Sequence, residues 1–336
     1  MFIHDALQRL NARQTTRAIA TDISGAFDRV DRDRLLNVLE QKCGIRGKLL
    51  DLLRSYFSDR FFRVVVGGHC SIPRPELAGV VQGSVSGPLY WLIFFIDCEL
   101  AAQAASAESV PGDPASTGCF ADDMTVWGDP KAADAGERGA LQWCGENRVA
   151  MDPGKRVVTD FQTNRQQPAG RQRLPVTDFR LLGLQIDSAL TMERHISIAV
   201  AKGHKAVTRL LRLRPYLKDD PSALSRLYKI YVLPHLEYGA MGFLHAHPAQ
   251  LARLDAVQRR FSRVSGISDL QSLGQRRFYL AMLYFYKTLV LGRELTWLGP
   301  LSQCDLPHPR ECGLAGPHES HIASRSSTPT SRAGGY

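Results

Sequence analysis

The spacing of hydrophobic and polar positions divides the sequence into a mixed first part and a helical second part. In the first part, short apolar runs bounded by glycine or aspartate alternate with stretches of helical periodicity. Short apolar runs are typical of strands, and a period of three to four residues is typical of amphipathic helices. The first part is therefore expected to combine strands and helices.

The expected elements of the first part are, in order, a strand at 17–22, helices at 31–43 and 48–57, a strand at 61–66, a glycine- and serine-rich loop at 82–88, an apolar helix from 89, a hairpin at 119–127, a helix at about 132–149, and strands near 157–161 and 179–186. Asp31 is a good N-cap for the first helix, and Gly44 ends it. Asp122-Asp123 is expected at the tip of the hairpin.

From about residue 191 the pattern becomes helical, basic and leucine-rich, over residues 191–214, 222–235, 248–264 and 273–295. Prolines separate these stretches, as expected at helix ends. The tail from Pro300 is rich in Ser, Pro, Gly and His, a composition typical of disordered segments. The expected domains are a mixed domain over 1–190, an all-α domain over 191–299 and a disordered tail over 300–336.

The positive charge is concentrated in the second part. The whole chain has a formal net charge of +9. Residues 1–192 hold 22 Lys and Arg against 23 Asp and Glu, whereas residues 193–300 hold 17 against 7, a balance of +10. Such a block indicates a polyanionic partner such as nucleic acid. A set of solvated helix faces has the same composition, and charge alone does not decide between the two interpretations.

Apolar runs and cysteines bear on the location of the protein. The longest uninterrupted apolar run, residues 89–96, is well short of the roughly 20 residues needed to cross a bilayer. The N-terminus has neither the charged flank nor the apolar stretch of a signal peptide. The seven cysteines are scattered and odd in number, which is typical of reduced thiols. We therefore expect an intracellular protein, in the nucleus or the cytoplasm, with no membrane partner.

Three short clusters carry the candidate chemistry. They are Thr21-Asp22-Ile23-Ser24-Gly25-Ala26-Phe27-Asp28, then Gly79-Val80-Val81-Gln82-Gly83-Ser84-Val85-Ser86-Gly87-Pro88, and finally Phe120-Ala121-Asp122-Asp123. Two adjacent carboxylates at a turn repel each other, and burial raises this cost, so such a pair usually needs a cation nearby. The order and spacing of the clusters matter more than any one of them.

A distant strand-end aspartate, Asp22, would complete a hard oxygen-ligand site for Mg²⁺ with Asp122 and Asp123. Two such ions can bind both the attacking and the leaving oxygen of an in-line phosphoryl transfer. The alternative for the adjacent pair alone is that it caps a hairpin turn and does nothing else.

In this order, the three clusters resemble motifs A, B and C of reverse transcriptases. Met151-Asp152-Pro153-Gly154-Lys155 is similar to motif D of that family, and residues 181–196 and 231–239 are similar to the segments that follow in non-LTR, LINE-like elements. The resemblance covers roughly residues 18–266. It implies an α+β fold, a right-hand polymerase palm with an antiparallel sheet and packed helices, including a remnant of the fingers, followed by an all-α thumb. Residues 182–195 disfavour a group II intron or telomerase-type polymerase.

The resemblance assigns catalytic roles to individual residues. Asp22, Asp122 and Asp123 match the catalytic aspartates that bind two Mg²⁺ ions, with Mn²⁺ as an alternative cofactor. Lys155 matches a lysine proposed to protonate the pyrophosphate leaving group. Without the motif, Lys155 would be read as a solvated loop charge.

Three residues match the part of the family that binds nucleotide and template. Phe27 matches the aromatic residue that closes on the sugar and excludes a 2′-hydroxyl. Without the motif it would be read as a core phenylalanine that follows a strand. Gln82 and Gly83 match the loop that lies against the template and the incoming nucleotide, where a glycine lets the backbone approach closely.

Four other carboxylates are expected to lie outside the metal site. Asp28 belongs to motif A but is expected to anchor the turn after the strand. Asp31 and Asp33 are explained as helix-start residues. Asp97 follows an apolar run and is expected at a helix end or an interface.

The sequence departs from the family pattern in two ways. Val81 stands where many relatives have proline, and Ser86-Gly87 stand where Leu-Ser or Leu-Gly is common. Only about twenty residues precede Asp22. The expectation is therefore an N-terminally truncated chain that lacks an endonuclease domain and the basic fingers that orient the triphosphate.

The resemblance implies an RNA-directed DNA polymerase that adds dNTPs to a primer 3′-hydroxyl by two-metal phosphoryl transfer. Its partners would be an RNA template, a DNA primer and dNTPs, and the Arg and Lys residues of the thumb would follow the duplex backbone without reading sequence. The alternative is a catalytically inactive nucleic-acid-binding remnant of a retroelement. The intact aspartates argue against this alternative, and the missing fingers argue for it.

Overall fold

The computed structural model describes residues 1–162, 179–217 and 220–289 of the 336-residue chain. The chain divides into a first unit, residues 1–281, and a second unit that begins at residue 282. Every element below belongs to the first unit, except for the end of the last helix. The domain boundary predicted at residue 190 stays a prediction, and the tail predicted from residue 300 lies outside the described residues.

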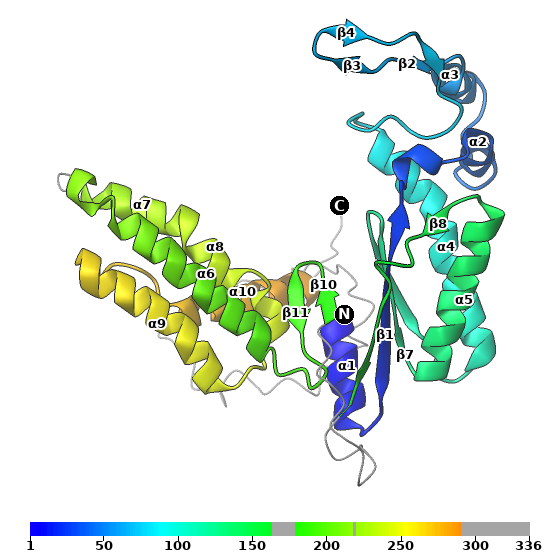
Figure 1. Cartoon of the computed structure of the whole chain (residues 1–336). Helices are drawn as coiled ribbons and strands as arrows, with labels where there is room; N and C mark the ends of the chain where they lie inside the picture. The colour runs from blue at the N-terminus through cyan, green and yellow to red at the C-terminus, as the bar shows by residue number, and fades with distance from the viewer. Residues whose placement is uncertain (163–178, 218–219, 290–336) are drawn as a thin grey trace, which may run out of the picture. The chain divides into compact units, whose positions relative to one another are not determined.

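The centre of the first unit is an antiparallel sheet built around the long strand β1 (Thr16–Ser24) (Figure 1). One edge of β1 pairs with β7 (Asp123–Gly128), which also pairs with β6 (Ser116–Phe120). The other edge is shared by β9 (Val157–Phe161) and β8 (Ala150–Met151). The hairpin and the two longer strands confirm the elements predicted from the sequence.

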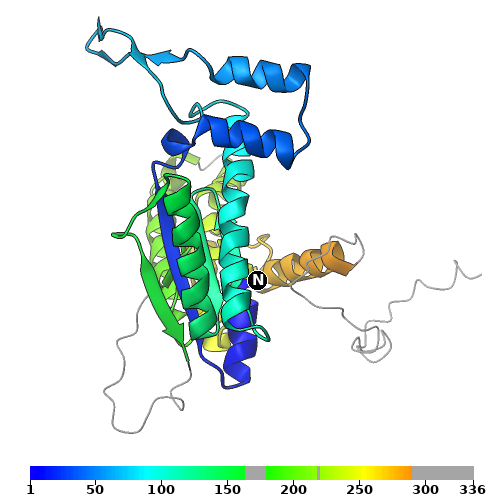
Figure 2. The same ribbon diagram turned by 90° about the vertical axis from the view of Figure 1, so that its right-hand side faces the viewer.

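One face of the sheet is covered by the helices α4 (Gly87–Ser109) and α5 (Pro130–Glu146), which lie side by side (Figure 2). They approach closely at Gly139, where a Cβ would lie only 2.6 Å from the carbonyl oxygen of Ala101, so the absence of a side chain allows the contact. Ile19 of β1 is buried in the core that these helices form with the sheet. The length and hydropathy of α4 would suffice to cross a membrane, and buried core helices share both properties.

The opposite face of the sheet packs against α1 (Phe2–Asn11), a helix that was not predicted. Its first residue, Phe2, is buried, and its ring centroid lies 5.3 Å from that of Phe161 and 5.7 Å from that of Trp127. The indole nitrogen of Trp127 donates to the carboxylate of Asp5 at 3.0 Å. Because successive side chains of a strand point to opposite faces, the strands of the sheet contribute to both cores.

The chain between β1 and α4 forms η1 (Phe27–Arg29), α2 (Arg32–Gln41), α3 (Lys48–Phe57), β2 (Phe61–Phe62), β3 (Val65–Val66), β4 (His69–Cys70) and β5 (Arg74–Pro75). The strand predicted over 61–66 is interrupted, since β2 pairs with β5 whereas β3 pairs with β4. All four short strands are exposed, so no core supports a longer one. The Arg32 guanidinium holds the end of α3 and the segment after β5 together by donating to the carbonyls of Phe57, Glu76, Ala78 and Gly79.

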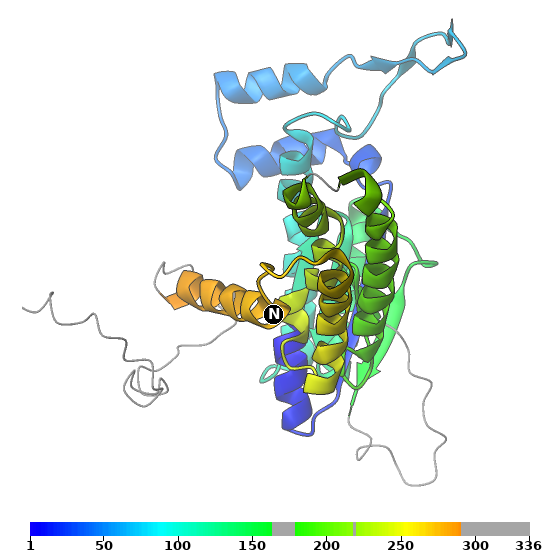
Figure 3. The same cartoon turned by 90° about the vertical axis from the view of Figure 1, so that its left-hand side faces the viewer.

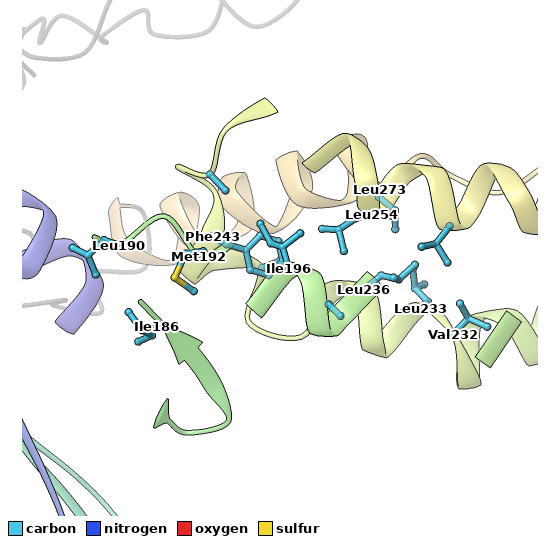
Figure 4. Close-up of a cluster of buried hydrophobic side chains, with 14 of the residues drawn as sticks. Ile186, Leu190, Met192, Ile196, Val232, Leu233, Leu236, Phe243, Leu254 and Leu273 are labelled. Atoms are coloured by element: carbon cyan, nitrogen blue, oxygen red, sulfur yellow. The ribbon is translucent and has the colours of Figure 1, made fainter. Parts of the chain in front are cut away.

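The second part of the chain begins with a hairpin and is then helical. The elements are β10 (Phe179–Leu181), β11 (Leu184–Ile186), α6 (Glu193–Leu211), η3 (Arg214–Leu217), α7 (Pro221–Tyr231), α8 (Leu233–Glu237), η4 (Ala240–Phe243), α9 (Pro248–Ser265) and α10 (Leu273–Leu289). α6 lies beside α9 (Figure 3), and Ile196, Leu236 and Leu254 are buried between α6, α8 and α9 (Figure 4). An antiparallel sheet with packed helices, followed by a helical part, confirms the predicted α+β class.

Candidate functional site

The register of β1 on β7 brings two of the predicted aspartates together. Asp22 and Asp123, which are about a hundred residues apart in sequence, are directly opposite partners in the antiparallel ladder. The Cβ atoms of such partners lie about 4.5–5.5 Å apart. The amide of Ile23 donates to the carbonyl of Asp122 at 3.1 Å, which fixes the third aspartate beside the same strand end.

The turn that carries Asp122 is tight and strained. β6 and β7 are joined by Ala121 and Asp122 alone, and Phe120 pairs with Asp123. Ala121 has φ +55°, a conformation that glycine adopts far more readily than alanine. The carbonyl of Ala121 accepts a hydrogen bond of 2.7 Å from the indole nitrogen of Trp91 on α4. This hydrogen bond anchors the strained turn to the helix that follows the second cluster.

The carboxylates of this strand end repel one another. Burial raises the pKa of Asp123, and the nearby charges of Asp122 and Asp22 raise it further. Lys155 and Arg180 act in the opposite direction on the same pKa. The ionised form of Asp123 is therefore disfavoured until more positive charge is supplied.

Lys155 contributes part of that positive charge. Its ammonium is 2.6 Å from Oδ2 of Asp22, and this hydrogen bond is the main cause of the raised pKa of Lys155. The loop that carries Lys155 is itself attached to β1, because the amide of Asp152 donates to the carbonyl of Asp22 at 2.8 Å. An Asp152 carboxylate oxygen then accepts from the Gly154 amide at 2.9 Å, which closes the turn before Lys155. The predicted motif D thus reaches the predicted motif A.

The second cluster is attached to the end of β1 by backbone contacts. The amide of Val80 donates to the carbonyl of Phe27, and the amide of Gly79 donates to the carbonyl of Val30, both at 2.8 Å. Gly79 has φ +90°, and a Cβ there would lie 2.9 Å from Asp28 Cα and from the Phe27 carbonyl oxygen. Only glycine allows this approach, so Gly79 is the residue that holds the two clusters together.

Three residues predicted to bind nucleotide and template lie in this attached region. The side-chain amide of Gln82 donates to Oδ1 of Asp28 at 3.1 Å. Gly83 has φ +82° and open space where a Cβ would be. The half-buried ring of Phe27 lies 6.1 Å from the ring of Trp91. Asp28 therefore binds the loop of the second cluster and is not assigned to the predicted metal site.

The donor set at the strand end suits a hard divalent cation. Oxygen ligands from several carboxylates are those that Mg²⁺ prefers, and their mutual repulsion would be relieved by a bound cation. Within the described residues, no three acidic, histidine or cysteine side chains are already gathered as a metal-binding group. Asp22 is instead engaged by Lys155, whose side chain is 61% exposed and is not confined by its surroundings.

Two more of the carboxylates that were expected outside the site, Asp31 and Asp97, have other partners. Asp31 caps α2 by accepting from the amide of Arg34 at 3.1 Å, as predicted. Asp97 lies in the middle of α4, so its expected position at a helix end is wrong. It forms an ion pair of 2.6 Å with Lys42, the residue that follows α2, and so joins two helices.

Two residues near the site were not identified from the sequence. Trp91 was one apolar residue in an apolar run, and nothing local indicated that its indole would bond to a turn thirty residues away. The positive charge of Arg180 on β10 lowers the pKa of Asp123, although the two residues are distant in sequence. By contrast, Arg9 and Arg17 precede Asp22 but form ion pairs elsewhere, with Asp113 and Asp160.

The two later segments that were singled out also meet. The Tyr238 hydroxyl donates to the carbonyl of Leu182, and Gly183, with φ +83°, would bring a Cβ within 3.1 Å of that hydroxyl. Nδ1 of buried His195 accepts from the amide of Gln185 at 3.4 Å, and its Nε2 lies 3.2 Å from the Tyr238 carbonyl. The β10–β11 hairpin is thereby attached to the segment between α8 and η4.

Comparisons with known sequences agree on one protein family. Residues 3–186 match the family model described as Reverse transcriptase (RNA-dependent DNA polymerase). The "Probable RNA-directed DNA polymerase from transposon BS" of Drosophila melanogaster is 26% identical over 280 residues, which cover 76% of this chain and 30% of that protein. The "RNA-directed DNA polymerase from mobile element jockey" of Drosophila funebris is 28% identical over 280 residues, which cover 79% and 30%. This chain thus spans about 30% of the length of these relatives.

Similar solved structures include two telomerases. The telomerase of Candida albicans, in complex with a TWJ fragment of telomeric RNA, has a TM-score of 0.46 at 11% identity and matches 78% of this chain and 49% of its own. The apo telomerase of Candida tropicalis has a TM-score of 0.44 at 14% identity and matches 80% and 46%. This chain covers less than half of either structure.

Proposed function

Since the chain belongs to the reverse transcriptase (RNA-dependent DNA polymerase) family and is of the non-LTR, LINE-like kind, we propose that it extends a DNA primer with deoxynucleotides on an RNA template. The observation that carries this proposal is the antiparallel pairing of Asp22 with Asp123, with Asp122 in the adjoining turn. That pairing supports the proposal because it brings the backbone positions of three acidic residues from two distant segments to one end of the palm sheet.

Asp22, Asp122 and Asp123 would hold two Mg²⁺ ions, with Mn²⁺ as an alternative. Bound there, the two cations would activate the primer 3′-hydroxyl and neutralise charge on the attacking and leaving oxygens. The raised pKa of Asp123 supports this assignment, because carboxylates crowded in this way favour a cationic ligand.

Lys155 would act on the leaving group. Its pKa is raised, so the ammonium carries a proton at neutral pH. In the proposed reaction it leaves the Asp22 carboxylate and donates that proton to an oxygen of the departing pyrophosphate. The exposed side chain of Lys155 has the freedom that this movement needs.

The loop beside the strand end would position the incoming nucleotide. Phe27, half-buried against Trp91, is proposed to close on the sugar where a 2′-hydroxyl would sit. Gln82 and Gly83 would lie against the template and the nucleobase, and the open space at Gly83 lets the backbone approach a ligand. The bond from Gln82 to Asp28 holds this loop against the segment that follows β1.

The helical thumb would bind the backbone of the primer–template duplex, because residues 193–300 hold 17 basic against 7 acidic residues. Phosphate contacts of this kind orient the duplex without reading its sequence. The proposed substrates occur in the nucleus and the cytoplasm, so the protein would act inside the cell and without a membrane partner.

Two measurements on Asp22→Asn test the proposal. Primer extension on an RNA template in Mg²⁺ should fall by about 10³-fold or more, which is roughly 4 kcal/mol of barrier. Binding of Mn²⁺, followed by electron paramagnetic resonance, should weaken in the same variant. Asp97→Asn, which removes a carboxylate from a surface ion pair on α4, is the matched control and should change neither. Wild-type Mn²⁺ binding in the Asp22 variant would show that the carboxylates do not hold the metal.

A further inference from the structure

The seam between α6 and α9 combines close helix packing with a row of basic side chains. A Cβ at Gly203 of α6 would lie 2.6 Å from Leu236 Cδ2 of α8 and 3.2 Å from Val257 Cγ1 of α9, so both helices pack closely on α6 at this glycine. Arginines of α9 reach side chains of α6 across this seam. Two arginines do so, Arg253 and Arg260, which are seven residues apart on α9.

The guanidinium of Arg260 is held by neutral acceptors. Nη1 donates to Nδ1 of His204, and Nη2 donates to Oγ1 of Thr208, both at 3.2 Å. The Thr208 hydroxyl gives its own hydrogen to the carbonyl of His204 at 2.9 Å, which leaves its lone pairs for Arg260. Because a guanidinium only donates, Nδ1 of His204 must accept here, and the ring hydrogen lies on Nε2.

The other arginine of the seam has a different environment. Arg253 donates to the hydroxyl of Ser197 at 3.0 Å and is also within 4.0 Å of the Glu193 carboxylate. Arg260 has no such partner, since no carboxylate of the described residues lies within 4.0 Å of its nitrogens. The structure therefore orients one positive charge and leaves it without a counter-charge.

A hollow of about 370 Å³ lies beside these groups and is lined only by basic and hydroxyl side chains. They are His204, Lys205, Thr208, Arg209 and Arg212. α6 and α9 contain two acidic residues, Glu193 and Asp255, and both are paired with arginines. An anion that enters the hollow would meet hydrogen-bond donors and no unpaired carboxylate.

We propose that this seam is a phosphate-binding site for the nucleic-acid backbone, in which Arg260, bonded to His204 and Thr208 of the hollow, is the oriented donor and Arg209 and Arg212 are further donors that line the hollow. The inference rests on the proposed polymerase function and adds a defined contact to it. The ligand is a run of phosphodiesters rather than a single anion, because the two helices together hold eight Lys and Arg against two acids. α6 extends over about 28 Å at 1.5 Å per residue, which is the length of several nucleotides.

Three variants separate this contact from general charge. Arg260→Ala should weaken binding of an RNA–DNA hybrid duplex about fivefold to tenfold and lower the slope of log K against log salt by about 0.9, the value for one phosphate contact. Arg259→Ala removes the same charge from the neighbouring position, where the guanidinium, among the described residues, bonds to the Ala252 carbonyl of its own helix and to nothing on α6, and should cost less than about twofold. Thr208→Val keeps the charge but releases Arg260, and it should weaken binding by an intermediate factor.

Binding is measured by fluorescence anisotropy on the full chain, with circular dichroism to check that each variant is folded. Equal effects of Arg260→Ala and Arg259→Ala, or no effect of Thr208→Val, would overturn the site. Inorganic phosphate at matched ionic strength should compete no better than chloride, and polyglutamate should compete less well than duplex. Stronger competition by either would assign the site to a free anion or an acidic protein instead.

Wild-type primer extension, followed in parallel, separates this inference from the proposed function. If the wild type extends primers while the two arginine variants bind equally, only the seam is refuted. If the wild type neither binds the hybrid duplex nor extends primers, both conclusions fail.

Discussion

The end of the palm sheet and the α6–α9 seam are opposite solutions to one problem, the crowding of like charges. At the sheet end, Asp22 forms an ion pair with Lys155, and the pKa of neighbouring Asp123 is raised by burial and by the charges of Asp122 and Asp22. At the seam, Arg260 is oriented by a histidine and a threonine, and no carboxylate of the described residues lies within 4.0 Å of its nitrogens. In both places the fold holds more charge of one sign than it compensates. The sign of the excess indicates the missing ligand, a cation in the first case and a polyanion in the second.

The two clusters differ in how rigidly they are built. The aspartates are set by a strand register, in which a slip of one residue would turn every side chain to the other face. The arginines are set by side-chain hydrogen bonds between two helices, with long flexible side chains. Rigid placement suits bond formation, which depends on distances of a few tenths of an ångström, whereas backbone binding tolerates variation.

The largest expected effect separates chemistry from docking. Asp122→Asn should slow single-turnover primer extension by about 10³-fold or more, because a metal-ligating carboxylate is lost. The same change should leave hybrid-duplex affinity within about twofold, since the seam is untouched. The pattern expected for Arg260→Ala is the reverse. Extension by Asp122→Asn within about tenfold of the wild type would contradict the division of labour.

A smaller effect is expected at Phe27, the residue proposed to select the sugar of the incoming nucleotide. Phe27→Val should raise ribonucleotide incorporation relative to deoxyribonucleotide incorporation by about tenfold, or roughly 1.4 kcal/mol, because the shorter side chain leaves room for a 2′-hydroxyl. The ratio is measured by primer extension with each nucleotide alone. Phe120→Val, at an exposed aromatic beside the same turn, is the control and should not change it. An unaltered ratio in Phe27→Val would make Phe27 a packing residue only.

The rigidity of the carboxylate end can be tested through the Trp91 indole. Trp91→Phe keeps an aromatic ring but removes the hydrogen bond to the Ala121 carbonyl, and it should lower the free energy of unfolding by about 1 kcal/mol. Extension should slow several-fold because the turn that carries Asp122 is less firmly held. Trp143→Phe, at a tryptophan with ring contacts to Phe94 and Phe95, should affect stability without slowing extension. Equal slowing by both would show that the hydrogen bond has no special role.

The smallest effect concerns the ligand-free chain. Asp123→Asn and Arg209→Gln should each raise the free energy of unfolding by about 0.5 kcal/mol, or roughly 1 °C in melting temperature, because each removes one crowded charge. Because the pKa of Asp123 is raised in the folded state, its ionisation lowers the free energy of unfolding. This destabilisation is absent below the unfolded pKa of about 3.9 and is fully present once the pH has risen through the folded pKa.

The Asp123→Asn gain should therefore be present at pH 7 and vanish near pH 3. Thermal unfolding in a metal chelator measures it, and Asp129→Ala at the start of α5 serves as the comparison, where loss of a helix cap should instead destabilise. A gain for Asp123→Asn that is unchanged at low pH would argue against charge crowding.

Local patterns in the sequence were enough to predict the central strands and most helices. The strand at 157–161 and the helix at 48–57 agree with the structure to the residue. The hairpin with its acidic tip was predictable because two polar residues interrupt an apolar run. These features depend on neighbours within a few positions, which the sequence shows directly.

Contacts between distant residues were not predictable in this way. The N-terminal helix α1 was missed, although its Phe2 fills the core beside Trp127 and Phe161. The carbonyl of Ala121 accepts from an indole thirty residues earlier, and the guanidinium of Arg260 is oriented by side chains of α6. Family motifs predicted which residues would meet, but a motif gives no hydrogen-bond geometry.

The central position of β1 has a consequence for biosynthesis. The strand occupies residues 16–24, yet its partners on one edge lie at 123–128 and on the other at 150–161. A nascent chain must therefore keep an apolar strand with two unpaired edges for more than a hundred residues of synthesis, during which it can pair with other chains. Nonsense products that end before residue 120 would retain β1 without its partners, and we expect them to aggregate rather than bind metal.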